Sequence, residues 1–291
     1  MIDQIAYTKM HGCRNDYIYL DNLNGNLDGL SVDQLKKLSI KVSNRKTGLG
    51  SDGLIVIHKS DNPQAIARMQ MFNADGSEGK MCGNGIRCVA KFLHEKMGAK
   101  PSFKISTLSG IRECFVIEAT DPKKFQVRVN MGRPSFLPGN LPVLFDDVMV
   151  MDEDFEVDGK NFKISCVSMG NPHCVIEVDS LDTFDVQKYG SKIEKHEAFP
   201  EGVNVEFIEV KSDKILQRTW ERGSGETQAC GTGACAVGVV LIMKKKRKAP
   251  VDIQLKGGAL RIEWDGLREA WMTGEAVTES TGTLKLKDWL N

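Results

Sequence analysis

The chain has 291 residues with 41% hydrophobic content, enough for one large core or two cores of roughly 140 residues each. Its 39 basic side chains balance its 39 acidic ones, so no net field is available to hold a nucleic-acid backbone or an anionic membrane surface. The N-terminal sequence MIDQIAYTKMHG lacks a secretory signal, and no window approaches the about eighteen apolar residues that span a bilayer. We therefore expect two domains in a cytoplasmic protein, without nucleic-acid or membrane partners.

Short runs with strand character, separated by Gly, Asn, Asp and Pro, are predicted at 54–58, 67–72, 103–107, 127–130, 163–168, 203–210, 253–255 and 260–264. Apolar residues at helical spacing predict a helix over 84–97, with Gly98 as its C-cap. The almost wholly apolar stretch 234–243 predicts a second helix, enclosed by sheet. Many short strands with few long helices favour the α+β class over a doubly wound parallel sheet.

The two halves of the chain contain similar sequence segments. The segment ETQACGTGACAV (226–237) repeats EGKMCGNGIRCV (78–89), and both copies contain Cys-Gly-x-Gly before a predicted helix. We interpret this as a duplication that gives two pseudo-symmetric domains, each a mainly antiparallel sheet wrapped around a central helix. The active site is then expected in the cleft between them.

The repeat also suggests where the domains begin and end. Asn15 and Asn171 each stand just before a β-like run, which extends the match between the halves. We place the first domain at 1–130 and the second at 131–275, with the strand-like tail 276–291 completing the first.

The eight cysteines are not expected to form disulfides in a reducing compartment. No Cys-x-x-Cys or His-Glu-x-x-His spacing occurs, so no metal site is expected. Packing is the better explanation for the cysteines within apolar periodic segments, Cys88, Cys114, Cys166 and Cys235. The GLGSDG segment (48–53) lacks the lysine and hydroxyl residue of a phosphate loop and is interpreted as a turn.

Cys82 and Cys230 occupy matching positions in the two Cys-Gly-x-Gly motifs. Free N–H groups and positive potential at a helix start should lower a thiol pKa below about 8.5, and such N–H groups can clamp a carboxylate. Two facing domains would place one thiol on either side of an amino-acid α-carbon, so that one removes a proton and the other delivers one. A lone cysteine of this kind is usually a small buried hydrophobe, but two symmetric copies favour an acid/base pair.

Five separated segments resemble the diaminopimelate epimerase family: MHGCRNDYIYLD, MFNADGSEGKMCGNGIRC, MGNPHCV, EGVNVEF and WERGSGETQACGTGACA. The resemblance covers nearly the whole chain. It implies an isomerase that interconverts LL- and meso-2,6-diaminopimelate without pyridoxal phosphate or any other cofactor, in lysine and peptidoglycan precursor biosynthesis. A homodimer is the expected assembly.

The resemblance also implies roles for particular residues. Cys82 and Cys230 become the acid/base thiols, and His173 and Glu221 assist them. The expected substrate-binding residues are Asn15, Asn73, Gly83, Asn84, Asn171, Asn204, Glu221, Arg222, Gly231 and Thr232. Backbone N–H groups at the two helix starts would surround the reacting carboxylate, and Arg222 would pair with the distal carboxylate. Taken singly, each asparagine could be an ordinary turn residue.

One departure from the family and two alternatives stay open. Cys13 and Arg14 stand where the family has Gly-x-Gly-Asn, which reduces backbone freedom before Asn15 and adds a thiol near the pocket. The chain could be another cofactor-free racemase of the same fold, acting on proline, hydroxyproline or histidine, for which Arg222 would have no partner. It could also be a binding module or a phenazine-type isomerase, which the presence of both thiols disfavours.

Overall fold

The computed structural model describes residues 4–98, 100–119, 125–145 and 148–290. The chain divides into two compact units: unit 1 comprises residues 1–129 and 274–291, and unit 2 comprises residues 130–273. Within the described ranges, no helix is long and apolar enough to cross a membrane.

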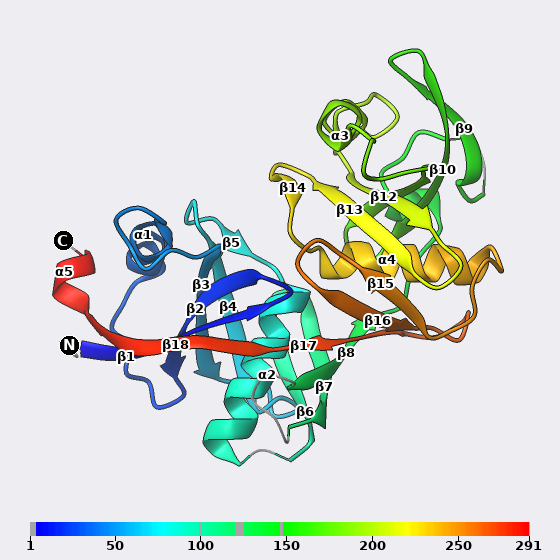
Figure 1. The fold of residues 1–291 in the computed structure, drawn as a ribbon. Coiled ribbons are helices and arrows are strands. Elements are labelled where there is room, and N and C mark those ends of the chain that lie inside the picture. The colour runs from blue at the N-terminus through cyan, green and yellow to red at the C-terminus, as the bar shows by residue number, and fades with distance from the viewer. Residues whose placement is uncertain (1–3, 99, 120–124, 146–147, 291) are drawn as a thin grey trace. The chain divides into compact units, whose positions relative to one another are not determined.

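Unit 1 is a mixed sheet with a helix in its interior (Figure 1). Strand β1 pairs antiparallel with β2, β2 parallel with β3, β3 antiparallel with β4, β4 parallel with β6, and β6 antiparallel with β7. The tail strand β18 pairs with β1. The elements are β1 (Gln4–Gly12), β2 (Asn15–Asn22), α1 (Val32–Ser43), β3 (Gly53–Lys59), β4 (Ala67–Asn73), β5 (Glu78–Gly79), α2 (Gly83–Met97), β6 (Ser102–Thr107), β7 (Gly110–Glu118), β8 (Gln126–Gly132, across the unit boundary), β18 (Val277–Lys285) and α5 (Leu286–Leu290).

Helix α2 is the interior helix of unit 1 and packs against β1, β2 and β7. Ile86, Val89 and Leu93 recur at helical spacing and are fully buried, and each such burial contributes about 1.5–3 kcal/mol. Gly98 follows the helix in the left-handed conformation (φ 57°), which glycine adopts without a Cβ penalty. The predicted helix over 84–97 and its C-cap are therefore confirmed.

Unit 2 repeats this plan. Strand β10 pairs antiparallel with β11, β11 parallel with β12, β12 antiparallel with β13, β13 parallel with β15, and β15 antiparallel with β16. The elements are η1 (Pro138–Asn140), β9 (Met151–Val157), β10 (Lys160–Ser168), β11 (Pro172–Glu177), α3 (Val186–Glu194), β12 (Asn204–Val210), β13 (Ile215–Glu221), β14 (Gly225–Thr227), α4 (Gly231–Met243), β15 (Val251–Gln254), β16 (Ala259–Glu263) and β17 (Ala270–Glu275, across the unit boundary).

Helix α4 is the interior helix of unit 2, and it packs against β10, β11, β12, β15 and β16. Almost every residue from Gly231 to Leu241 is buried, as the all-round apolar sequence indicated. It begins three residues before the predicted start at 234, because Cys230 caps it.

The order of antiparallel and parallel pairings from β1 to β7 matches the order from β10 to β16. This confirms the expected α+β class with two pseudo-symmetric halves, each wrapped around one helix. Three further α-helices of the described residues, α1, α3 and the short α5, were not predicted individually. Ser31 and Gln34 form a capping box at the start of α1, a signal that the sequence carries in SVDQ.

Candidate active site

The thiol of unit 1 stands at the start of α2. Cys82 is the N-cap, and its Sγ accepts a hydrogen bond from Gly85 N at 3.3 Å and donates one to Asn15 Oδ1 at 3.3 Å. Asn84 Nδ2 donates to the same Asn15 oxygen at 3.3 Å. Asp52 Oδ2 accepts from Asn15 Nδ2 at 2.7 Å, which fixes the direction of the Asn15 amide. The structure thus brings Asn15 and Asn84 to Cys82, and their role in substrate binding stays a prediction.

Two residues that the sequence analysis did not single out support this cluster. Asp52 belongs to the GLGSDG segment interpreted as a turn, so that turn also orients Asn15. Arg87 is fully buried, and it donates to Asn84 Oδ1 at 3.0 Å and to Gly83 O at 3.1 Å. A charged residue inside the apolar face of a predicted helix was the available signal for Arg87.

The loop before Asn15 explains the departure from the family pattern. Cys13 and Arg14 both have left-handed backbone conformations (φ 54° and 61°), so Arg14 adopts the strained region that a glycine would occupy freely. Cys13 is fully buried and accepts from Arg87 Nη2 at 3.6 Å. Asn15 still begins β2.

Asn73 lies at the end of β4, where its Nδ2 donates to Ser77 Oγ at 2.9 Å within the 73–77 turn. Tyr17, not predicted, lies beside Cys82, and burial raises the pKa of its phenol well above the usual range, with the neighbouring Cys82 adding to the effect.

The thiol of unit 2 stands at the start of α4. Cys230 is the N-cap, and its Sγ accepts from Gly233 N at 3.4 Å and lies 3.4 Å from Thr232 Oγ1. Asn171 Nδ2 donates to Thr232 Oγ1 at 3.4 Å, and Asn171 Oδ1 lies 3.0 Å from His173 Nε2. A chain of side-chain contacts thus runs from Cys230 through Thr232 and Asn171 to His173.

Behind His173 lies Glu206, which the sequence analysis missed. His173 Nδ1 lies 2.8 Å from Glu206 Oε1, and both side chains are completely buried. Glu206 interrupts the apolar run of β12, and a carboxylate between Val205 and Phe207 was the available signal.

The electrostatics of Cys230 correct one expectation. Burial raises the pKa of the Cys230 thiol well above its usual range, and the negative charges of Glu221 and Glu206 raise it further. The hydrogen bond from Gly233 N acts in the opposite direction but is outweighed. The prediction that a helix start lowers the pKa is therefore wrong for Cys230, because desolvation and two carboxylates exceed the effect of the helix terminus.

Glu221 lies at the end of β13 and faces Cys230. Burial raises the pKa of its carboxyl, while hydrogen bonds from Thr227 and Cys230 and the charge of His173 oppose that rise. Thr227 Oγ1 donates to Glu221 Oε1 at 2.6 Å. Glu221 therefore belongs to the cluster around Cys230, and its catalytic role stays a prediction.

The remaining predicted residues of unit 2 lie around the chain reversal after β13. Asn204 is buried, donates to Pro172 O at 2.9 Å and accepts from Arg222 N at 3.0 Å, so it braces the backbone. The Arg222 side chain is exposed, and its Nη1 donates to Glu201 O at 2.8 Å. Gly231 is the first residue of α4, as Gly83 is of α2.

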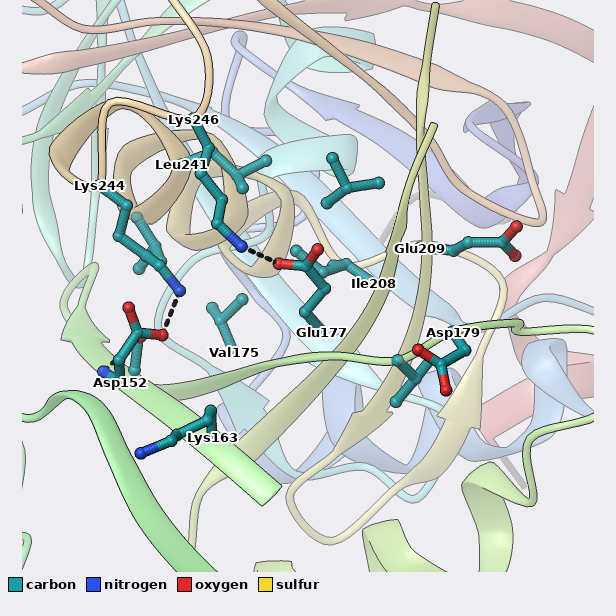
Figure 2. A pocket seen from close by; sticks show the side chains of 14 residues that line it. Asp152, Lys163, Val175, Glu177, Asp179, Ile208, Glu209, Leu241, Lys244 and Lys246 are labelled. Carbon is teal, nitrogen blue, oxygen red and sulfur yellow. Dashed lines mark hydrogen bonds and ion pairs between the residues drawn. The ribbon is translucent and has the colours of Figure 1, made fainter. Parts of the chain in front are cut away.

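A cavity of about 500 Å³ lies at the opposite end of α4 from Cys230. Figure 2 shows Lys244 paired with Asp152, and Lys246 paired with Glu177. None of the predicted site residues lines this cavity. In the described part of the chain, no group of three or more His, Cys, Asp or Glu side chains could hold a metal ion.

Comparison with known proteins gives the family. The family model for diaminopimelate epimerase matches residues 7–137 and 165–279. A diaminopimelate epimerase of Acetivibrio thermocellus is 44% identical over 98% of this chain and 100% of its own length. One from a Geobacillus species is 45% identical, over 97% of this chain and 99% of its own length.

Solved structures share the fold at low sequence identity. A Bacillus anthracis protein of the PhzF phenazine biosynthesis family has a TM-score of 0.69 at 16% identity, covering 97% of this chain and 99% of that one. A hydroxyproline epimerase of Agrobacterium vitis, solved with trans-4-hydroxy-L-proline, has a TM-score of 0.68 at 15% identity, covering 97% and 91%. From the family model and the relatives above 40% identity, the chain belongs to the diaminopimelate epimerase family, and it is an isomerase.

Proposed function

We propose that this chain converts LL-2,6-diaminopimelate to meso-2,6-diaminopimelate by a two-base proton transfer between Cys82 and Cys230, and so supplies lysine and peptidoglycan precursor synthesis. The observation that carries the proposal is the pair of matched helix N-caps. Each thiol accepts a hydrogen bond from the third residue of its helix, in a chain of the diaminopimelate epimerase family. A cytoplasmic homodimer stays a prediction.

In the proposed reaction, the thiolate of one cysteine takes the α-proton and becomes a thiol. The carbanion that remains takes a proton on its opposite face from the thiol of the other cysteine, which becomes a thiolate. Configuration is inverted, and the two cysteines exchange their protonation states. N–H groups at the two helix starts stabilise the carboxylate as negative charge spreads onto it, and the proposal includes no cofactor.

Arg222 favours the proposal that the substrate carries a second carboxylate. Its side chain is exposed, and its Nη1 is held by the Glu201 carbonyl. The planar fork of a guanidinium suits a carboxylate, so Nη2 would bind the distal one. Proline, hydroxyproline and histidine have no such group.

The test is turnover of LL-diaminopimelate in deuterated water with wild type, Cys82→Ala and Cys230→Ala. We expect deuterium at the α-carbon with wild type and near-complete loss of epimerisation in each variant, because either face needs its own proton carrier. Cys114→Ala, at a buried position in β7, serves as the control and should remain active. Retained epimerisation in either thiol variant, or product without solvent deuterium, would contradict the two-base mechanism.

Arg222→Met tests the substrate. We expect loss of activity on diaminopimelate with an unchanged far-UV circular dichroism spectrum. Full activity of this variant, or faster racemisation of proline than of diaminopimelate by wild type, would favour the small-substrate alternative.

A further inference from the structure

Glu206 and His173 form a completely buried pair in unit 2. His173 Nδ1 lies 2.8 Å from Glu206 Oε1, and His173 Nε2 lies 3.0 Å from Asn171 Oδ1. An ionised carboxylate and an amide oxygen are both acceptors, so each ring nitrogen faces an acceptor. An imidazole satisfies two acceptors only when both nitrogens carry protons, as in the imidazolium ion.

The charges of the pair agree with this protonation state. A doubly protonated ring beside an ionised carboxylate makes a charge-assisted hydrogen bond, and the 2.8 Å between His173 Nδ1 and Glu206 Oε1 fits one. The result is an ion pair with no net charge, which a fully buried position tolerates far better than a single ion. Glu206 Oε2 has no hydrogen-bond partner among the described residues, so His173 is the group that compensates the carboxylate.

Unit 1 has an apolar set of residues at the matching place. A Cβ on Gly85 would lie 2.7 Å from Ile55 Cδ1 and 3.2 Å from Met69 Cε. The duplicated helix start of unit 2 has polar groups there instead, since a Cβ on Gly233 would lie 2.6 Å from Glu206 Oε1 and 3.2 Å from Gln217 Nε2.

The fold therefore accepts apolar side chains behind the capping cysteine. A buried carboxylate at this place costs desolvation free energy that packing does not require. Its presence only in unit 2 points to a role in the chemistry of that half.

We propose that Glu206 is a positioning residue that keeps His173 permanently protonated, so that His173 acts on Cys230 by its fixed positive charge and not as a proton shuttle. The inference rests on the proposed function of Cys230. From His173, hydrogen bonds lead through the Asn171 amide and the Thr232 hydroxyl to Cys230 Sγ. The imidazolium offsets the negative charge that develops when Cys230 gives up its proton.

The other titratable groups around the pair are few. Glu221, at the end of β13, faces Glu206, His173 and Cys230, and Cys174 on β11 faces Glu206. These groups are present equally in wild type and in a variant at Glu206. Burial raises the pKa of Glu221 and of Cys230, and the charge of Glu206 raises both further, so the activity ratio is interpreted together with the direct measurement of His173 protonation in the second test.

The first test is the pH profile of Glu206→Gln relative to wild type, as kcat/KM for LL-diaminopimelate from pH 6 to pH 8.5. Without the carboxylate, no anionic acceptor holds the proton on His173 Nδ1, so the imidazole is expected to become neutral as the pH rises. The ratio of variant to wild-type kcat/KM should then fall up to about tenfold per pH unit, until the activity of the neutral form limits it. Gln217→Met, which gives a neighbour of Glu206 the apolar side chain found in unit 1, is the matched control and should show a ratio independent of pH.

A purely structural role of Glu206 would lower activity by the same factor at every pH, and a flat ratio for Glu206→Gln would therefore overturn the proposal. A similar slope in Gln217→Met would overturn it as well, because the slope would then follow from disturbed packing.

The second test needs neither turnover nor a folded variant at Glu206. Nuclear magnetic resonance of wild type with ¹⁵N-labelled histidine reports the protonation of both ring nitrogens, and His173→Gln assigns the signal among the five histidines. We expect both nitrogens of His173 to stay protonated from pH 6 to pH 8.5. A neutral His173 at pH 7 overturns the inference, whereas a charged His173 in a chain inactive on diaminopimelate refutes only the proposed function.

Discussion

Arg87→Met removes the cation that holds the start of α2. In the structure the guanidinium donates to Gly83 O at 3.1 Å, Asn84 Oδ1 at 3.0 Å and Glu275 O at 2.9 Å, and the side chain is fully buried. Each buried acceptor left without a donor costs about 1–3 kcal/mol, and methionine packing recovers part of this. We expect the free energy of unfolding to fall by about 3–5 kcal/mol, in the range for breaking a buried charged network.

Urea unfolding measures the loss. With a slope of about 1–3 kcal/mol per molar urea, the midpoint should fall by about 1 M or more, and hydrogen exchange within residues 83–97 should show the loss in α2. Arg261→Met is the control, because Arg261 is exposed and pairs with Asp252 at 2.8 and 2.9 Å, an arrangement worth about 1 kcal/mol or less. Equal losses in the two variants would refute the reasoning.

Three further predictions concern the thiols and their neighbours. Burial raises the pKa of Glu221, so the folded chain binds this proton more tightly than the unfolded chain, and stability falls as the pH rises above the unfolded pKa of about 4.3. Glu221→Gln removes that loss, and its urea midpoint relative to wild type should rise between pH 4.5 and pH 7. Gly233→Ala places a Cβ 2.6 Å from a buried carboxylate oxygen and should cost about 1–3 kcal/mol in urea unfolding, whereas Gly29→Ala, which meets open space, should cost less than about 0.5 kcal/mol. Burial raises the pKa of Cys88 to about 12, so mass spectrometry after iodoacetamide treatment at pH 8 should find Cys82, which is partly exposed, modified well before Cys88.

The sequence was sufficient to predict the elements whose pattern is local. The apolar spacing that ends at Gly98 determined α2, and each predicted strand lies within or overlaps an observed one. Helix α1 was not predicted individually because its buried apolar face is short and consists of Leu35, Leu38 and Val42. The pairing of β18 with β1 joins residues more than 250 positions apart, and no local pattern carries that information.

The candidate site was predictable where residues share a motif with the thiols. Asn84 and Thr232 lie two residues after the two cysteines, and the structure places both in the clusters around them. Arg87, Asp52 and Glu206 reach the clusters from positions that look like packing or turn residues in sequence. Their roles depend on which strand lies behind each helix start, and tertiary structure alone determines that.

The two thiols have different surroundings, and the residues that sequence reasoning missed account for much of that difference. Duplication supplied two copies of one helix start, and both retain the cysteine N-cap and the bond from the third residue of the helix. Side chains behind the helix then diverged, so that Cys82 contacts Asn15 and lies beside Tyr17, whereas Cys230 lies near Glu221, Glu206 and Thr232. A two-base reaction alternates which thiol is protonated, and two thiols in identical surroundings would give no preference to either arrangement. Burial raises the pKa of Cys230, and the charges of Glu221 and Glu206 raise it further, so Cys230 holds its proton more tightly, and the neighbouring imidazolium of our proposal opposes that effect.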